Sequence, residues 1–131
     1  MAQTPELKLL TVCENAFVAE NTKSLNLISI FDILQVENFP FFMPKFTIVS
    51  KFKAGPGSYS HEIIIKKKDG EAPIAVLPQT IIIATPSIYG QSIGTFFNFK
   101  FDTDGEYLIE IKINGIVQDL NTSIYVKVIK K

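Results

Sequence analysis

The chain has 131 residues, and its 13 lysines, without any arginine, balance 13 acidic residues to a formal net charge of zero. This balance provides no global field for recruiting nucleic acid or an anionic membrane, and the planar guanidinium fork that reads phosphate or guanine is missing. A single cysteine, Cys13, excludes an internal disulfide, and one histidine with one cysteine excludes the usual zinc ligand sets.

The length fits a single domain over residues 1–131, large enough to bury one core without a disulfide or a metal. The sequence has no charged-then-apolar leader and no apolar run near the ~18 residues that a membrane span needs. We therefore expect a cytoplasmic protein without a membrane partner, a specific nucleic-acid partner or a cofactor.

The first part of the chain predicts three strands. Residues 7–19 form the first, with poor alternation, and a polar turn follows at residues 21–24. Residues 25–36 are apolar at both parities, which is typical of a strand at the centre of a sheet or covered on both faces, although periodicity leaves a short buried helix open. Residues 45–53 alternate, and this pattern places Phe46, Ile48 and Phe52 inward.

The segment Phe39-Pro40-Phe41-Phe42-Met43-Pro44 is expected to interrupt regular structure, because each proline removes a donor and restrains the residue before it. A short loop between two prolines cannot easily bury four large apolar side chains locally. If they are exposed, they mark a site for a protein partner or for self-association. The alternative is a plug that closes one end of the fold. The four residues are Phe39, Phe41, Phe42 and Met43.

The middle of the chain predicts a series of short strands. A turn at 54–58 precedes a strand at 60–68, and an Asp-Gly turn at 69–70 precedes an edge or loop at 73–78. A short strand at 80–85 and a loop or ragged strand start at 88–94 follow. Alternation over 95–101 then places three phenylalanines inward, namely Phe97, Phe99 and Phe101.

Two polar features of this region could carry chemistry. His61 lies near serines and a glutamate, but no nucleophile elbow or other enzyme motif accompanies it, so we expect a polar residue at a strand entry and no catalytic residues. Lys66-Lys67-Lys68 would form a basic sheet face with Lys51 and Lys53 if their strands pair. The alternative is a solvated strand that guards its edge.

The segment from Phe101 to Ile116 is the most regular part of the sequence. Tyr107, Ile109, Ile111 and Ile113 alternate with more polar residues, which predicts a half-buried antiparallel strand. Asn114-Gly115 suits a type I′ turn that would pair Ile113 with Ile116, Ile111 with Gln118 and Ile109 with Leu120. The apolar set continues so far that we expect a break near residues 119–122, after which the last strand finds its own partner.

The acidic turn before this strand suggests an alternative site. Asp102-Thr103-Asp104-Gly105-Glu106 resembles the opening of a calcium loop, but Ile113 stands where an EF-hand needs a bidentate glutamate. Calcium held between end loops would remain, with Asp102, Asp104 and Asp119 as ligands and Asp32, Glu37 or Asp69 as additional ones. A plain turn explains the same residues.

Seven or eight short strands without a convincing amphipathic helix predict an all-β fold, a single antiparallel β-sandwich without a disulfide. Asp104-Gly105-Glu106-Tyr107 resembles the tyrosine corner of immunoglobulin-like sandwiches, although Ile109 stands where antibody domains place cysteine. The resemblance implies an immunoglobulin-like or transthyretin-like fold.

The N-terminal half resembles a family of small, functionally uncharacterised bacterial proteins with a predicted β-sandwich. The resemblance rests on Cys13-Glu14-Asn15-Ala16, on the segment from Leu27 to Asp32, and on Phe39-Pro40. It implies a fold but no ligand or catalytic residues.

These observations favour a non-enzymatic protein-interaction or assembly module, with a homodimer through an edge strand or the Phe-Pro loop as one form. The alternative is a module that binds calcium or a small polar ligand through end loops.

Overall fold

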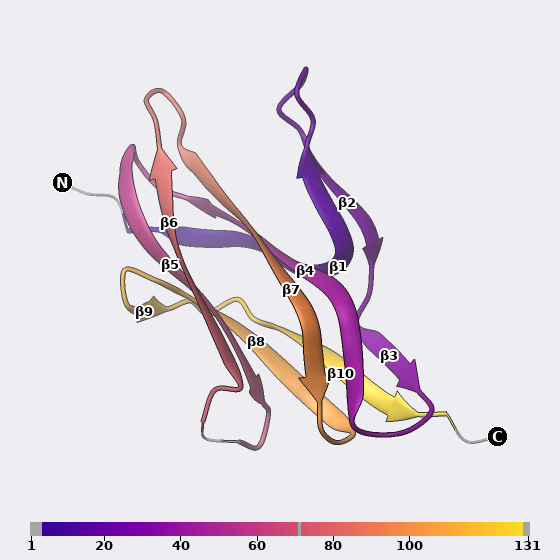
Figure 1. The fold of residues 1–131 in the computed structure, drawn as a ribbon. Helices are drawn as coiled ribbons and strands as arrows, with labels where there is room; N and C mark the ends of the chain where they lie inside the picture. Colours follow the sequence, from indigo (N-terminus) through magenta and orange to yellow (C-terminus); the bar gives the residue numbers. More distant parts are fainter. Residues whose placement is uncertain (1–3, 71, 130–131) are drawn as a thin grey trace.

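The computed structural model describes residues 4–70 and 72–129, and these fold into two β-sheets around a shared hydrophobic core (Figure 1). Ten strands and no helix occur among the described residues, and Cys13 is a free thiol. The predicted all-β fold class is confirmed. Ten strands replace the predicted seven or eight mainly because two predicted long strands, at 25–36 and after residue 116, are each divided in two.

Sheet A contains four antiparallel strands in the order β2, β1, β4 and β7. Strand β1 is long enough to pair with β4 along its first half and with β2 along its second half, and Cys13 pairs with both Thr47 and Ile30. The bounds are β1 Glu6–Val18, β2 Leu25–Ile30, β4 Phe41–Lys53 and β7 Tyr89–Phe101.

Sheet B contains five strands in the order β3, β10, β8, β5 and β6, with the two-residue β9 added beside β8. All pairs are antiparallel except β3 with β10, which is parallel and corrects the expectation of a purely antiparallel fold. The bounds are β3 Ile33–Val36, β5 Gly57–Lys67, β6 Ala75–Ile83, β8 Gly105–Ile113, β9 Ile116–Val117 and β10 Thr122–Val128.

The core lies between the two sheets and takes every second residue of their central strands. From β4 it receives Phe46, Ile48 and Phe52, as the alternation predicts. From sheet B it receives Ile63 and Ile65 of β5, with the alternating set of β8, namely Tyr107, Ile109, Ile111 and Ile113. The prediction for β8 is confirmed.

The prediction of one central strand over residues 25–36 is wrong. The chain leaves β2 at the edge of sheet A, crosses at Phe31 and Asp32, and enters β3 at the edge of sheet B. The Phe31 N–H donates to the Val12 carbonyl in sheet A, and the Tyr125 N–H of sheet B donates to the Asp32 carbonyl. Because the chain crosses between sheets here and does not turn back in a hairpin, β3 runs parallel to β10.

The second half of β1 and most of β2 form a hairpin, residues 14–29, that extends beyond the last β1–β4 pair at Cys13 and Thr47. We call this hairpin the arm. Figure 1 shows the tip of the arm standing away from the two sheets, in indigo and purple at the top of the view. A two-stranded ribbon of this kind is marginally stable by itself in water.

Regular structure starts earlier than expected in the proline-bounded segment. Strand β4 begins at Phe41 and includes Pro44, so the predicted interruption up to residue 44 is wrong. Pro44 is tolerated because β1 pairs with β4 only from Thr47 onward, which leaves the strand flanked by β7 alone at this point.

Phe97 was expected to point inward, and it is 68% exposed instead, while its neighbour Phe96 packs against the core. Asn98 explains the difference, because its φ of 50° is in the left-handed region that asparagine tolerates. This conformation reverses the alternation, so that the inward positions change from Phe96 to Phe99 and Phe101.

The Asn114-Gly115 turn closes the hairpin as predicted, with φ angles of 52° and 79° and Ile113 paired with Ile116. The Gln118 N–H donates to the Ile111 carbonyl at 2.9 Å. The break at residues 118–121 is also confirmed. After the break β10 gains a partner of its own, β3, as expected, but it also returns to β8, with Ile109 opposite Thr122, two residues beyond the predicted Leu120.

Two tyrosines close turns at the starts of β5 and β8. The Tyr107 hydroxyl donates to the Thr103 carbonyl at 2.7 Å and accepts from the Thr103 N–H at 3.3 Å, so the predicted tyrosine corner is present. The Tyr59 hydroxyl donates to the Gly55 carbonyl at 2.6 Å with the same spacing of four residues. This second corner was not predicted.

The edge strands β6 and β7 approach each other where β7 has small inward residues. A Cβ atom on Gly90 would lie 3.1 Å from Ile81 Cγ2 of β6, and one on Gly94 would lie 3.0 Å from Leu77 Cδ2 of β6 and overlap with Ile63 Cδ1 of β5. Both glycines therefore let sheet A approach sheet B along this edge.

Candidate functional site

The proline-bounded aromatic cluster is divided by the structure. Phe39, Phe41 and Met43 are half-buried and pack against the core, as the plug interpretation expects. Phe42 alone points away, with 53% of its surface exposed, and it lies opposite Lys100 of β7. One of the four predicted partner-binding residues is thus available on the surface.

The outer face of sheet A, which we call the A face, is the side turned away from the core. Cys13 and Val49 are buried on this outer side and do not belong to the core between the sheets, because the residues directly before or after them on the same strand point into that core. Register places Ile30, Cys13, Thr47 and Thr95 in one row across all four strands. The centre of the A face is therefore small, apolar or hydroxyl-bearing.

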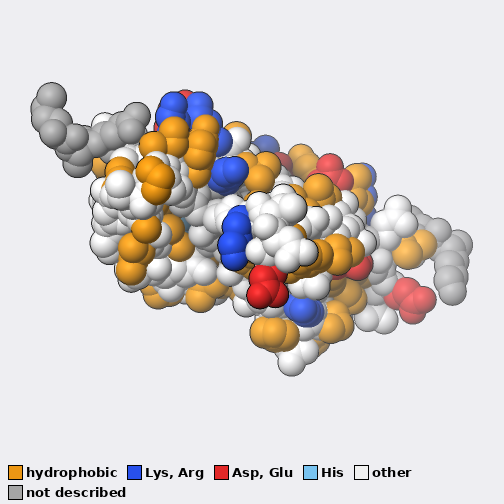
Figure 2. All heavy atoms as spheres, turned by 90° about the horizontal axis from the view of Figure 1, so that it is seen from above, with side chains coloured by type: hydrophobic (Ala, Val, Ile, Leu, Met, Phe, Trp, Pro, Cys, Tyr) orange, Lys and Arg blue, Asp and Glu red, His pale blue; other side chains and the backbone are white. Residues whose placement is uncertain are grey.

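Large apolar side chains lie exposed at both margins of the A face. Phe97 is 68% exposed on β7, and Ile30 is 63% exposed on β2. Phe17 and Ile28 continue the exposed apolar surface onto the arm, where both are close to half exposed. Figure 2, which views the molecule from above, shows hydrophobic side chains spread over this end with lysines among them.

Charge on the A face has one sign over most of its length. Lys45, Lys51 and Lys53 of β4 point outward, and within the described chain neither Lys45 nor Lys51 forms an ion pair. The Lys45 ammonium donates to Asn15 Oδ1 at 3.5 Å, and the Lys51 ammonium lies 4.8 Å from the Tyr89 ring centroid. An acid, Glu6, stands opposite Lys53 at the far end and bonds to Lys8.

The outer face of sheet B carries two ion pairs, although another lysine on this face, Lys112, forms none in the described chain. Lys66 bonds to Glu110 at 2.7 Å and Lys68 bonds to Glu106 at 2.8 Å. The Lys68 ammonium lowers the pKa of Glu106 below its usual value, and the same carboxylate raises the pKa of Lys68. Such neighbouring charges of opposite sign are typical of a solvated sheet face.

The predicted basic face of Lys66, Lys67 and Lys68 with Lys51 and Lys53 is not formed. The first three lie on or beside β5 in sheet B, whereas the other two lie on β4 in sheet A. Lys67 turns toward the β8 turn, where its ammonium bonds to the Thr103 hydroxyl and lies 5.8 Å from the Tyr107 ring centroid.

A polar cluster lies buried between the sheets. Ser50 is paired with Ser92 on sheet A, and His61 is paired with Gln79 on sheet B. Ser50 Oγ and His61 Nε2 are 2.8 Å apart, and the Ser92 hydroxyl donates to Gln79 Oε1. The expectation that His61 is a strand-entry residue is wrong, because its side chain lies fully inside.

The surroundings of His61 keep its imidazole neutral. Burial lowers its pKa from the ordinary 6.5 to about 4, against a smaller opposing effect of the neighbouring Gln79 side chain. Nδ1 has no hydrogen-bond partner among the described residues, and both Ser50 and His61 are closed to solvent. The pair resembles a nucleophile and base, but it has neither an orienting carboxylate nor a path for substrate.

The three aspartates of the calcium alternative are separated. Asp102 and Asp104 lie in the turn before β8, and Asp119 lies after β9 at the other end of that strand. Asp102 bonds to Lys100 at 3.2 Å. No three acidic, histidine or cysteine side chains gather as a metal site within residues 4–70 and 72–129.

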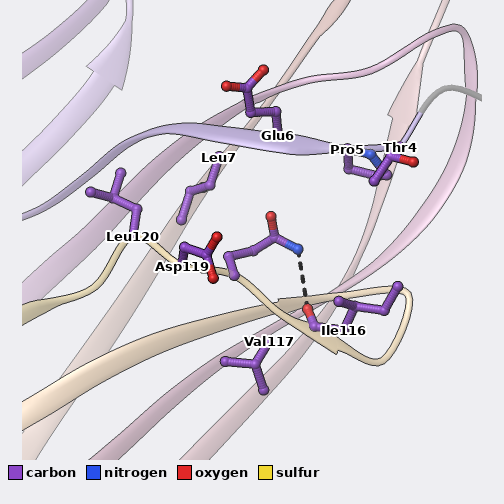
Figure 3. A pocket seen from close by; sticks show the side chains of 9 residues that line it. Thr4, Pro5, Glu6, Leu7, Ile116, Val117, Asp119 and Leu120 are labelled. Carbon is purple, nitrogen blue, oxygen red and sulfur yellow. Dashed lines mark hydrogen bonds between the residues drawn. The ribbon is translucent and has the colours of Figure 1, made fainter.

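A shallow hollow of about 600 Å³ lies between the start of β1 and the segment after the Asn-Gly turn (Figure 3). Leu7, Val117 and Leu120 supply apolar walls, and Glu6 and Asp119 supply carboxylates. Gln118 Nε2 bonds to the Ile116 carbonyl at 3.1 Å across its floor. None of the residues that line the hollow is basic, so the lining has no cationic side chain that could bind an anion.

Sequence reasoning missed the A face and the buried polar cluster. Parity offered a signal for the cluster, because Ser50 shares the inward parity of Ile48 and Phe52, and His61 shares that of Ile63 and Ile65. The A face had a weaker signal, namely the apolar residues at both parities of 25–30.

No helix in the described part of the chain is long and apolar enough to cross a membrane. The fold and surface define an all-β protein of two sheets, with two ion pairs on the outer face of sheet B and exposed apolar side chains beside unpaired lysines on the A face. Residues 8–127 match the model of the family of unknown function DUF6941, and the chain belongs to this family. The predicted membership in an uncharacterised family is thus confirmed. The comparison with curated proteins finds no match.

Proposed function

We propose that this chain is a non-enzymatic protein-interaction module whose binding surface is the A face with the adjoining arm. The observation that carries the proposal is the difference between the two outer faces. On sheet B two lysines are paired with glutamates, whereas on the A face the exposed side chains of Ile30 and Phe97 flank Lys45 and Lys51, which form no ion pair in the described chain. Exposed apolar surface with unmatched charge marks interaction sites.

The surface lies on strands and not on loops, which supports a binding role further. The inward side chains of β4 belong to the core, so the exposed side chains at the margins of the A face are held on a rigid sheet. Phe42 adds an exposed aromatic side chain on the same outer side of β4.

The non-enzymatic part of the proposal is supported by the polar cluster. The Ser50 and His61 pair has the chemistry of a nucleophile and base, but both side chains are fully buried and the imidazole is neutral. Its geometry fits a polar link between the sheets better than it fits catalysis.

We also propose that the fold is an immunoglobulin-like sandwich, and the tyrosine corner at Tyr107 and Thr103 supports this grouping. The parallel pair of β3 and β10 departs from the simplest form of that fold.

Site-specific photo-crosslinking tests the binding surface in cells of the natural source. A photoreactive phenylalanine is placed at Phe97 or at Ile30, and the control position is Tyr125, which is 43% exposed on the outer face of sheet B. Crosslinked species should form from Phe97 and Ile30 and not from Tyr125. No crosslinks from the A face, or equal yields from both faces, would overturn the proposal.

A further inference from the structure

The arm is apolar on both of its faces, although it lies at an edge of sheet A. Phe17 and Ile28 lie on the side continuous with the A face, and Val18, Leu25 and Leu27 alternate with them on the opposite side. Alternation of this kind predicts a strand covered from both sides. In the described part of a single chain these side chains remain exposed or partly exposed. The pattern therefore predicts that another surface covers them.

The charges of the arm are complementary to those of the A face. The arm and its turn contain Glu14, Glu20 and Lys23, all exposed, and so carry a net negative charge. The A face has Lys45 and Lys51 without ion-pair partners in the described chain. An arm placed on the A face of another molecule would bring carboxylates to these lysines and cover apolar side chains at the same time.

The accessible part of the contact lies at the margins of the A face and on the arm. Cys13, Thr47 and Val49 at the centre of the face are fully buried, whereas Ile30 and Phe97 at its margins are 63% and 68% exposed. A dimer contact would therefore be made by these margins, by the outward lysines of β4 and by the arm.

We propose that the A face binds a second copy of this chain in a twofold dimer, in which the arm of each molecule packs on the A face of the other. This inference rests on the proposed function, because it names the partner of the same surface. A twofold arrangement makes the two arm-to-face contacts identical, as isologous interfaces require.

Charge reversal on each half of the contact tests the dimer. The face variant is Lys45→Glu with Lys51→Glu, and the arm variant is Glu14→Lys with Glu20→Lys. Sedimentation equilibrium over a concentration series should show a dimer for the wild-type chain. Each variant alone should dimerise at least about tenfold more weakly, since each then places like charges together in both contacts.

An equimolar mixture of the two variants provides the decisive measurement. In the mixed dimer both contacts are again between opposite charges. Native mass spectrometry should therefore detect the heterodimer under conditions in which neither variant alone forms a homodimer. Lys112→Glu with Lys127→Glu, on the outer side of sheet B, gives the same change in net charge and should leave the dimer intact. Circular dichroism checks that every variant is folded.

A wild-type chain that stays monomeric over the series, or a mixture that does not associate, would overturn the dimer. So would a face variant that dimerises as tightly as the wild-type chain. If Phe97 and Ile30 still crosslink to a different protein, the proposed interaction function stands without self-association. The absence of all crosslinks removes the proposed function itself.

Discussion

At the scale of single residues, His61 links the sequence to the pH dependence of stability. It is the only histidine in the chain, and burial lowers its pKa in the fold from 6.5 to about 4. Between these two values the unfolded chain binds a proton that the folded chain does not. Folding stability contributed by the neutral imidazole is therefore complete above about pH 6.5 and is lost as the pH falls toward 4.

The free energy of unfolding should consequently fall by about 3 kcal/mol between pH 7 and pH 4, at about 1.4 kcal/mol per pH unit. Urea denaturation at several pH values measures this slope. Carboxylates titrate mainly at the lower end, so the interval from pH 6.5 to 5 reports on His61. His61→Gln should flatten that interval, and an unchanged slope in this variant would contradict the assignment.

The two tyrosine corners allow a second residue-scale prediction. Tyr107→Phe and Tyr59→Phe each remove a hydroxyl that donates to a carbonyl four residues earlier, so each should lower the free energy of unfolding by about 1 kcal/mol. Tyr89→Phe is the matched control, because Tyr89 is exposed and keeps its ring beneath Lys51. Equal effects in all three variants, measured by denaturant unfolding, would show that the corners contribute nothing specific.

Only one of these corners could be predicted from the sequence. Asp104-Gly105-Glu106-Tyr107 combines a turn with a regular strand, which identifies Tyr107 by local pattern. Tyr59 follows Gly55-Pro56-Gly57-Ser58, where glycine and proline allow several turn geometries. The spacing to Gly55 becomes visible only when the chain path is known.

At the scale of secondary-structure elements, the contact between β6 and β7 depends on the small residues of β7. Gly94→Ala should lower the free energy of unfolding by about 1–3 kcal/mol, because the new methyl group would overlap with Ile63 Cδ1 of β5 and lie 3.0 Å from Leu77 Cδ2 of β6. Gly55→Ala is the control, since a Cβ there meets nothing within 4 Å. Thermal or urea unfolding of the two variants makes the comparison.

Ile63→Val removes the overlapping Cδ1 atom and should therefore restore part of the stability that Gly94→Ala loses. A double-mutant cycle measures this coupling. Strict additivity of the two changes would show that the methyl group is accommodated in another way.

The sequence predicted β8 well and the pair β2 and β3 poorly, for a physical reason. Alternation in β8 and the Asn114-Gly115 turn are local signals that fix both the strand and its hairpin. Residues 25–36 are apolar at both parities, and this pattern is the same for a central strand and for an arm that lacks its partner surface. In β7 a single left-handed residue, Asn98, reversed the predicted orientation of Phe97.

At the scale of the whole molecule, the arm should be the least protected regular element in dilute solution, because it is a two-stranded ribbon without a covered face. Amides of residues 15–18 and 25–28 should exchange faster with deuterium than the amides of residues 47–50 in β4. If the proposed dimer forms, arm protection should rise with protein concentration while β4 protection stays nearly constant. Concentration-independent exchange of the arm would argue against its role in association.

The candidate surface was less predictable than the fold, because surfaces depend on which strands become neighbours. Lys51 and Lys66 both point outward from an inner strand of their sheets. Pairing of β5 with β8 gives Lys66 the carboxylate of Glu110, while the neighbours of β4 provide none for Lys51. The predicted aromatic cluster was reduced to Phe42 by the same long-range effect, because core packing absorbed its other members.

The crossing at Phe31 and Asp32 constrains how the molecule can deform. These two residues connect β2 to β3 covalently, while their backbone groups are hydrogen-bonded to Val12 in one sheet and Tyr125 in the other. The sheets therefore cannot slide past each other along their strands without breaking this link. The two ends of the arm therefore enter different sheets, because β1 continues into sheet A beside β4, whereas β2 continues through Phe31 and Asp32 into β3 of sheet B.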